Sequence, residues 1–218
     1  MTTLIEPTPV EVRARIADAP TPWREFFGYL LISGSRVSEA VAEAQPGDDA
    51  NTPKHRPARN YGVYLTMSRV PHELGEAALF TVRTAKRGGM ERAVAVPLEH
   101  DPITRGVVDL WEKTDGNPWQ WNRGQALYQA HKLFAGMGYV VEEQGRGAAK
   151  VEKHLKPVGN HAMRHFRTQE LMLKFDFSDR DLMQFFGWTA RNIGINPMII
   201  RYAALKWQNY YPKLTRQY

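Results

Sequence analysis

The middle of the chain has the patterns of β-strands, between two regions with helical patterns. These strands limit the folds that the chain can adopt. Tyr61–Met67 alternates apolar and polar residues as a half-buried strand does, and Ala78–Thr84 and Glu91–Pro97 have the composition of two more strands. The glycine-containing run Lys86–Gly89 between the last two is typical of a hairpin turn. Three consecutive strands with short connections predict a small antiparallel sheet.

Helical spacing dominates on both sides of these strands. Thr8–Ala17 begins with a capping-box pattern, and Trp23–Ile32 is apolar enough for a buried helix. Ser33–Ser35 separates it from a further helical pattern over Arg36–Ala44. Later helices are predicted over 102–113, 122–136, 161–174, 179–186 and 197–208. The predicted fold class is mostly α with a small antiparallel β-sheet, an α+β protein.

No break in composition divides the chain, so we expect a single domain over residues 1–218. Residues 1–7 are expected to be a loose tail, and 138–159 a connection in which Tyr139–Val141 is a candidate short strand. The segment 203–218 is an apolar tail that either docks on a neighbouring subunit or folds back on its own domain. No separate amino-terminal domain is expected, because few residues precede Trp23.

Positive charge is concentrated in the last third of the chain. Residues 150–218 carry 12 Lys and Arg against 5 Asp and Glu, whereas residues 1–149 carry 17 against 18. Such a surplus favours a polyanionic partner, although many proteins have a basic face without one. The chain has no cysteine, which excludes disulfides and thiolate chemistry. With no signal peptide and no long apolar run, a cytoplasmic protein without a membrane partner is expected.

His161 and Arg164 are three residues apart and therefore share a face of the predicted helix. This pair suits phosphate chemistry, because an arginine holds phosphate oxygens while a histidine moves a proton. An ordinary charged surface helix is the alternative. His161 and His165 also have the four-residue spacing of half a zinc site, but no glutamate or cysteine completes it, so no metal is expected.

Three further residues can carry chemistry, and each has a structural alternative. Arg36 follows a glycine break at a predicted helix start, where anions bind, and Glu39 can brace its guanidinium. Lys86 lies in the hairpin turn, from which a lysine reaches into a groove. Trp188 offers one indole N–H donor. A surface ion pair, a solvated turn and a core tryptophan are the respective alternatives.

Five segments that contain or extend these residues follow one another in a fixed order: SGSRVSEA, FTVRTAKRGGMERAVAVP, NHAMRHFRTQEL, DLMQFFGWTA and MIIRYAAL. In this order they resemble the motifs of tyrosine recombinases, the phage integrase family. The resemblance covers roughly residues 8–208. The chain resembles the family's catalytic domain alone. Such a chain would be a truncated protein or a minimal integrase like those of archaeal viruses and mobile elements.

The resemblance matches the family's catalytic positions to residues of this chain. They are Arg36, Lys86, His161, Arg164, Trp188 and Tyr202. Ser35 stands where leucine is usual, and Trp188 replaces the more common histidine. The hairpin turn is longer than usual, so Arg83 and Arg87 are alternatives to Lys86. Fourteen residues separate Trp188 from Tyr202, more than is typical, which keeps Tyr210 and Tyr211 as alternative nucleophiles.

The resemblance implies DNA cleavage without metal or other cofactor. Tyr202 would attack a DNA phosphorus and form a 3′-phosphotyrosyl bond. Arg36 and Arg164 would neutralise the phosphorane, and Trp188 would donate to one of its oxygens.

The remaining positions take roles in proton transfer and DNA binding. Lys86 would protonate the departing 5′ oxygen, His161 would move a proton at the phosphate or the phenol, and Glu39 would support Arg36. DNA contacts are expected from Arg87, Arg167 and Arg201.

The family resemblance also implies the partners: double-stranded DNA with a specific target site, on which a homotetramer assembles. Three other functions stay open on the sequence. They are a type IB topoisomerase-like enzyme that relaxes DNA, an inactive DNA-binding protein with a recombinase fold, and a basic helical domain of unrelated function.

Overall fold

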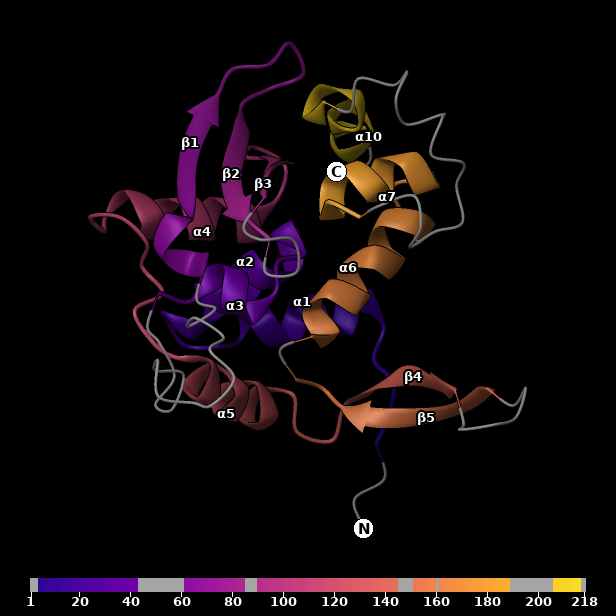
Figure 1. Ribbon diagram of the computed structural model, residues 1–218. Helices are drawn as coiled ribbons and strands as arrows, with labels where there is room; N and C mark the ends of the chain where they lie inside the picture. Colours follow the sequence, from indigo (N-terminus) through magenta and orange to yellow (C-terminus); the bar gives the residue numbers. More distant parts are fainter. Residues whose placement is uncertain are drawn as a thin grey trace.

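The structure is a computed structural model that describes residues 4–42, 61–84, 90–144, 151–159, 161–188 and 206–216, with only the backbone described for 141–144 and 151–154. It combines helices with a three-stranded and a two-stranded antiparallel sheet, which confirms the α+β class. The two sheets lie at opposite ends of the molecule, with most helices between them (Figure 1). None of the described helices is long and apolar enough to cross a membrane.

The first helices form where the sequence predicts them. α1 (Pro9–Ala17) begins with the predicted capping box, in which the Thr8 hydroxyl accepts from the Glu11 amide and the Glu11 carboxylate accepts from the Thr8 amide. α2 (Trp23–Ser33) is buried over almost its whole length and forms the centre of the core. α3 (Val37–Ala40) is shorter than predicted, because the Ala42 amide donates to the Trp119 carbonyl instead of extending the helix.

The three-stranded sheet has the order β1 (Thr66–Val70), β2 (Ala77–Arg83), β3 (Glu91–Pro97), with both pairs antiparallel. Strands β2 and β3 confirm the sequence prediction. The first strand begins later than predicted, because Tyr61–Tyr64 forms the 3-10 helix η1. A β-carbon at Gly62 would lie 2.2 Å from the backbone carbonyl oxygens of Ala40 and Val41, so packing of η1 against the end of α3 fixes its shape.

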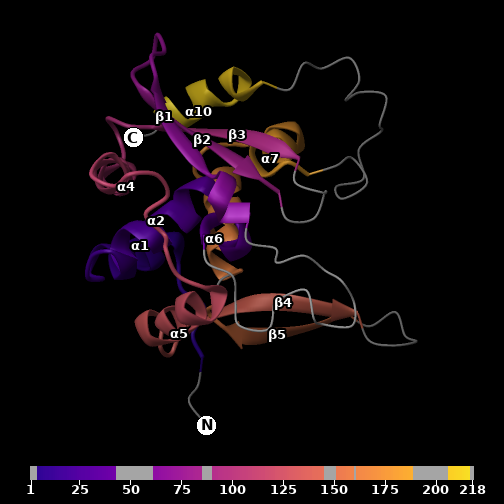
Figure 2. The same cartoon turned by 60° about the vertical axis from the view of Figure 1, so that its left-hand side comes forward.

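α4 (Pro102–Glu112) and α5 (Arg123–Leu133) follow the sheet, and both confirm predicted helices. The predicted connection over 138–159 is instead largely the hairpin β4 (Gly138–Gln144) and β5 (Val151–Pro157). The turned view shows this hairpin beside α5, away from β1–β3 (Figure 2). Ile5 bridges to Met137 at its start, so the described part of the expected loose tail is anchored to the fold.

α6 (Ala162–Leu173) and α7 (Asp179–Phe186) lie where the sequence predicts helices. The predicted helix over 197–208 falls mostly outside the described residues. Its last positions begin the 3-10 helix η2 (Trp207–Asn209), which precedes α10 (Tyr211–Thr215). Tyr211 and Leu214 of α10 are buried, as is Tyr210 just before it, so the described part of the terminal tail folds back on its own domain.

Arg167 was expected to contact DNA, and the structure contradicts this prediction. Its side chain is fully buried and forms an ion pair with Glu170. Arg13 of α1 also pairs with Glu170, at 2.6 Å, and with Asp101, at 3.2 Å. Because Asp101 also caps α4, these charges join α1, α4 and α6. Arg167 therefore supports the fold rather than facing solvent.

Glu170→Gln is expected to lower the free energy of unfolding by about 3 kcal/mol at neutral pH. Burial raises the pKa of Glu170, but the charges and hydrogen bonds of Arg167 and Arg13 outweigh burial and lower it to about 2. Because the folded-state pKa lies below the ordinary value of 4.5, this stabilisation is present above about pH 4.5 and is lost as the pH falls toward 2.

Urea unfolding of the wild type and the variant over that pH range measures the effect. The difference between them is expected to shrink on acidification. If the difference in unfolding free energy stayed constant from pH 6 to pH 2.5, the negative charge of Glu170 would not be its cause.

Candidate active site

The turn between α2 and α3 places Arg36 at the carboxyl end of the buried helix. Gly34 has a left-handed backbone (φ 58°), and a β-carbon there would lie 2.2 Å from the ring of Phe186. Only glycine therefore fits between α2 and α7. The next turn begins with Arg36, whose Nη1 donates to Glu39 Oε1 at 2.8 Å and whose amide donates to Oε2 at 2.9 Å. Glu39 is fully buried, so its carboxylate binds the Arg36 guanidinium from the interior of the protein.

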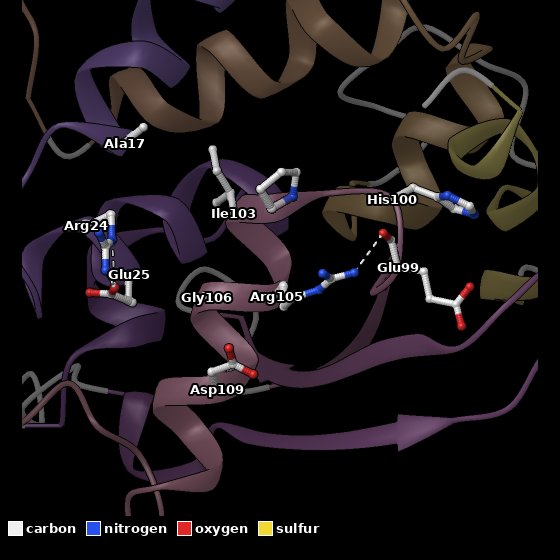
Figure 3. A pocket seen from close by; sticks show the side chains of 10 residues that line it. Ala17, Arg24, Glu25, Glu99, His100, Ile103, Arg105, Gly106 and Asp109 are labelled. Atoms are coloured by element: carbon white, nitrogen blue, oxygen red, sulfur yellow. Dashed lines mark hydrogen bonds and ion pairs between the residues drawn. The ribbon is translucent and has the colours of Figure 1, made fainter.

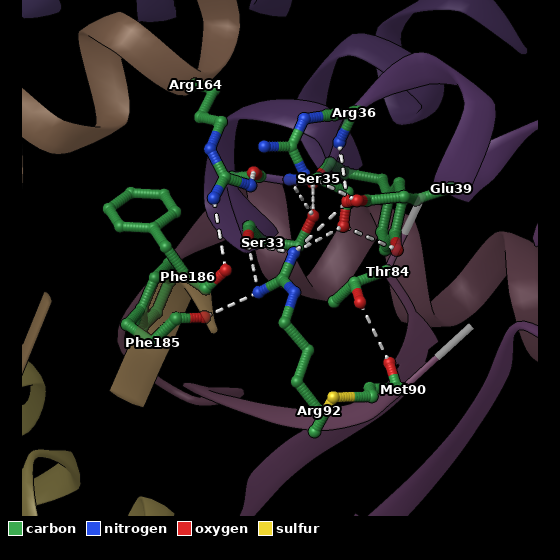
Figure 4. A network of polar contacts seen from close by, with 12 residues as sticks. Ser33, Ser35, Arg36, Glu39, Thr84, Met90, Arg92, Arg164, Phe185 and Phe186 are labelled. Atoms are coloured by element: carbon green, nitrogen blue, oxygen red, sulfur yellow. Dashed lines mark hydrogen bonds and ion pairs between the residues drawn. The ribbon is translucent and has the colours of Figure 1, made fainter. Parts of the chain in front are cut away.

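Arg164 connects α6 to the same turn. Its Nη1 donates to the Gly34 carbonyl at 2.8 Å and its Nη2 to the Phe186 carbonyl at 3.0 Å (Figure 4). The guanidinium also lies 4.5 Å from the centre of the Phe186 ring. These contacts fix the arginine between two backbone segments that are far apart in the sequence. The predicted pair of Arg36 and Arg164 is thus brought to one place.

Arg92 of β3 joins this pair, and sequence reasoning missed it. Its guanidinium donates to the carbonyls of Ser33 and Phe185 and to Ser35 Oγ, and lies 3.7 Å from Glu39 (Figure 4). A signal was present, because Arg92 alternates in phase with the buried Val94 and Val96 and therefore faces inward. Arg36, Arg92 and Arg164 are called the arginine cluster below.

Ser35 is a hydrogen-bond partner of this cluster, at the position where the family that the sequence resembles usually has leucine. It is fully buried, and its hydroxyl lies 3.0 Å from the Tyr29 hydroxyl and 3.1 Å from Arg92 Nη2. A leucine could not accept the hydrogen bond from Arg92. The serine and the inward-facing arginine therefore match each other.

The arginine cluster carries more positive than negative charge. Three guanidinium groups surround one buried carboxylate, that of Glu39. Burial and, to a smaller extent, the charges of Arg92 and Arg36 together lower the pKa of Arg164 to about 8, and the charge of Glu39 offsets only part of this shift. A bound anion would relieve this repulsion. The cluster thus has the electrostatics of a site for an anion such as phosphate.

Trp188 lies beside the cluster, at the edge of a cavity. Its ring stacks on Phe186 with centroids 4.7 Å apart, and Arg164 lies 5.6 Å from its centre. Trp188 and Arg92 both line a cavity of about 700 Å³, which we call the hairpin-root cavity because Thr84 and Met90 line it too. Those two residues end the described parts of the β2–β3 hairpin. The predicted Lys86 and Arg87 lie between them in the sequence, outside the described residues.

His161 immediately precedes α6, one turn ahead of Arg164, and it is exposed. It lines a second cavity, of about 560 Å³, together with Val37, the residue after Arg36. His165 instead packs its ring 5.7 Å from that of Tyr139. The structure therefore brings Arg36, Glu39, Arg164 and Trp188 together and places His161 next to them.

The predicted nucleophile Tyr202, and Arg201 beside it, lie outside the described residues. The alternatives Tyr210 and Tyr211 are both buried. The Tyr210 hydroxyl accepts from the Ala95 amide at 2.9 Å, and the Tyr211 hydroxyl donates to the Glu76 carbonyl at 3.0 Å. Burial raises the pKa of Tyr210, and it raises that of Tyr211 to about 12. Both phenols hold the end of the chain on the sheet, so neither is placed to attack DNA.

A third cavity, of about 460 Å³, lies near the amino end of α2, whereas the arginine cluster lies at its carboxyl end. Its charged side chains have mixed signs and partners nearby: Arg24 pairs with Glu25, and Arg105 donates to the Glu99 carbonyl (Figure 3). It lacks the positive surplus of the cluster.

Comparison of the chain with protein-family models, with curated proteins and with solved structures found no match.

Proposed function

We propose that this protein cleaves and rejoins DNA through a 3′-phosphotyrosyl intermediate, as a site-specific tyrosine recombinase. The observation that carries the proposal is the arginine cluster. Arg36, Arg92 and Arg164 come from three distant segments and gather around one carboxylate, beside an indole and the root of a hairpin. An arrangement with surplus guanidinium charge suits the phosphorane of phosphodiester cleavage, which carries two negative charges.

Each reacting bond has a residue assigned to it in the proposal. The Tyr202 oxygen attacks phosphorus, a new P–O bond forms, and the bond to the 5′ oxygen breaks. Arg36 and Arg164 bind the non-bridging oxygens, and the Trp188 indole donates to one of them. Lys86 gives a proton to the departing oxygen, and His161 takes the proton of the phenol. Rejoining reverses these steps, because the phosphotyrosine keeps the energy of the broken bond.

Arg92 is a positioning residue in this scheme. Its donors are directed to the Ser33 and Phe185 carbonyls and to Ser35, so it fixes the turn that presents Arg36. The substrate is double-stranded DNA, and recombination between two target sites requires four subunits on DNA. The positive charge that a metal ion would supply comes here from guanidinium groups.

A covalent-adduct assay tests the proposal. The purified chain is incubated in EDTA with nicked suicide duplexes whose sequence is randomised around the nick, and adducts that resist SDS are collected. We expect a protein–DNA adduct attached through tyrosine at a 3′ phosphate. DNA binding without any adduct would exclude the enzyme and support a DNA-binding protein without cleavage activity. Adducts together with relaxation of supercoiled DNA, but without strand exchange, would instead assign a topoisomerase.

A further inference from the structure

The cavity next to His161 is bounded by three elements that each contribute a basic side chain. Arg123, Leu127 and His131 recur every four residues and so share one face of α5. Lys156 of β5 and His161 ahead of α6 supply the other two basic side chains of the lining. A β-carbon at Gly159 would lie 3.9 Å from His131 Nε2, so the connection from β5 to α6 passes close to α5. We call this space the basic cavity.

The described residues that line the basic cavity contribute charge of one sign. Of the described residues that line it, four can carry positive charge and none has a carboxylate. The amino ends of α5 and α6 also meet there, since Arg123 is the first residue of α5 and His161 immediately precedes α6. Helix amino termini carry partial positive charge and favour anions. Both the side chains and the helix ends therefore favour an anionic ligand.

The basic cavity adjoins the arginine cluster. Val37 and His161 line the cavity, and they are one residue from Arg36 and one helical turn from Arg164. The hairpin-root cavity borders the cluster through Arg92 and Trp188. In both views α5 and the β4–β5 hairpin lie side by side at the far end from the three-stranded sheet (Figures 1 and 2). A strand of DNA that crosses the cluster can thus continue into the basic cavity.

We propose that the basic cavity binds a backbone phosphate of the same DNA, next to the phosphate that is cleaved, through Lys156, Arg123 and His131. The proposal rests on the proposed function, because it assumes that DNA crosses the arginine cluster. The phosphate contact contributes to binding and alignment rather than to bond cleavage. It gives the β4–β5 hairpin and α5, which stand apart from the sheet, a role as one side of the DNA-binding surface.

Salt-dependent binding of a 30-base-pair duplex tests this assignment. Each phosphate neutralised by the protein contributes about 0.9 to the slope of log affinity against log salt concentration. Lys156→Gln and Arg123→Gln are each expected to weaken binding and to reduce the magnitude of that slope by a part of the roughly 0.9 that this one phosphate contributes, whereas Lys156→Arg retains the wild-type slope and affinity. The matched control is Lys132→Gln, which removes the same charge one residue from His131 but lines a different cavity, beside Trp23.

Two outcomes overturn the proposal: equal slopes for Lys156→Gln and Lys132→Gln, or no duplex binding by the wild type. Thermal melts of all variants check that the folds are equally stable. The adduct assay distinguishes the two proposals. Adducts with a salt slope unchanged by Lys156→Gln would refute the basic cavity but not the recombinase. A slope that depends on Lys156 without any adduct would refute the enzyme but not the cavity.

Discussion

Replacing Tyr202 with phenylalanine is expected to abolish the covalent protein–DNA adduct while duplex binding is retained. The substitution removes the oxygen that forms the bond to phosphorus and leaves the ring, so no other step compensates. The readout is the SDS-resistant adduct on the suicide duplexes, with binding measured separately by fluorescence anisotropy.

Tyr210→Phe and Tyr211→Phe are the matched controls for this experiment. Both should keep the adduct, because their hydroxyls are buried in hydrogen bonds with the backbone of the sheet. Tyr210→Phe should also lower stability by about 1–3 kcal/mol, since it leaves the Ala95 amide buried without an acceptor. If the adduct persists in Tyr202→Phe and disappears in Tyr210→Phe or Tyr211→Phe, the tyrosine whose replacement abolishes the adduct is the nucleophile instead.

Arg164→Lys is expected to slow cleavage at saturating DNA by about 10²- to 10³-fold with little change in DNA affinity. Lysine keeps the positive charge but cannot hold two phosphate oxygens with a planar fork. It is preferred to alanine because Arg164 also binds the Gly34 and Phe186 carbonyls, so truncation would disturb the turn itself. The rate of adduct formation with excess protein measures the chemical step.

Arg180→Lys, an exposed position on α7, serves as the control for the same change of side chain. All rates are compared at a temperature where thermal melts show every variant folded. The role given to Arg164 would be wrong if the lysine variant lost DNA binding while its bound complexes reacted at the wild-type rate.

Local signals were sufficient for much of the fold. The capping box at Thr8 and the composition of Glu91–Pro97 predicted α1 and β3, because caps and strand composition act within a few residues. The candidate strand Tyr139–Val141 lies within β4, but the rest of the β4–β5 hairpin was missed because its polar sequence contains no clear alternation, and its start is held by the distant Ile5. The η1 turn was missed for a similar reason, since the close approach of Gly62 to the end of α3 fixes it.

The candidate site was likewise predicted only in part. The sequence alone determined the local spacing of the side chains that we propose bind phosphate: Arg36 has Glu39 three residues on, and Arg164 follows His161 by one turn. Only the tertiary structure decided that Arg164 reaches the Gly34 carbonyl, 130 residues away, that Arg92 points inward to join it, and that Arg167 turns into the core. The reason is physical: spacing along a helix fixes which side chains are neighbours, but burial and charge repulsion depend on packing between segments far apart in the chain.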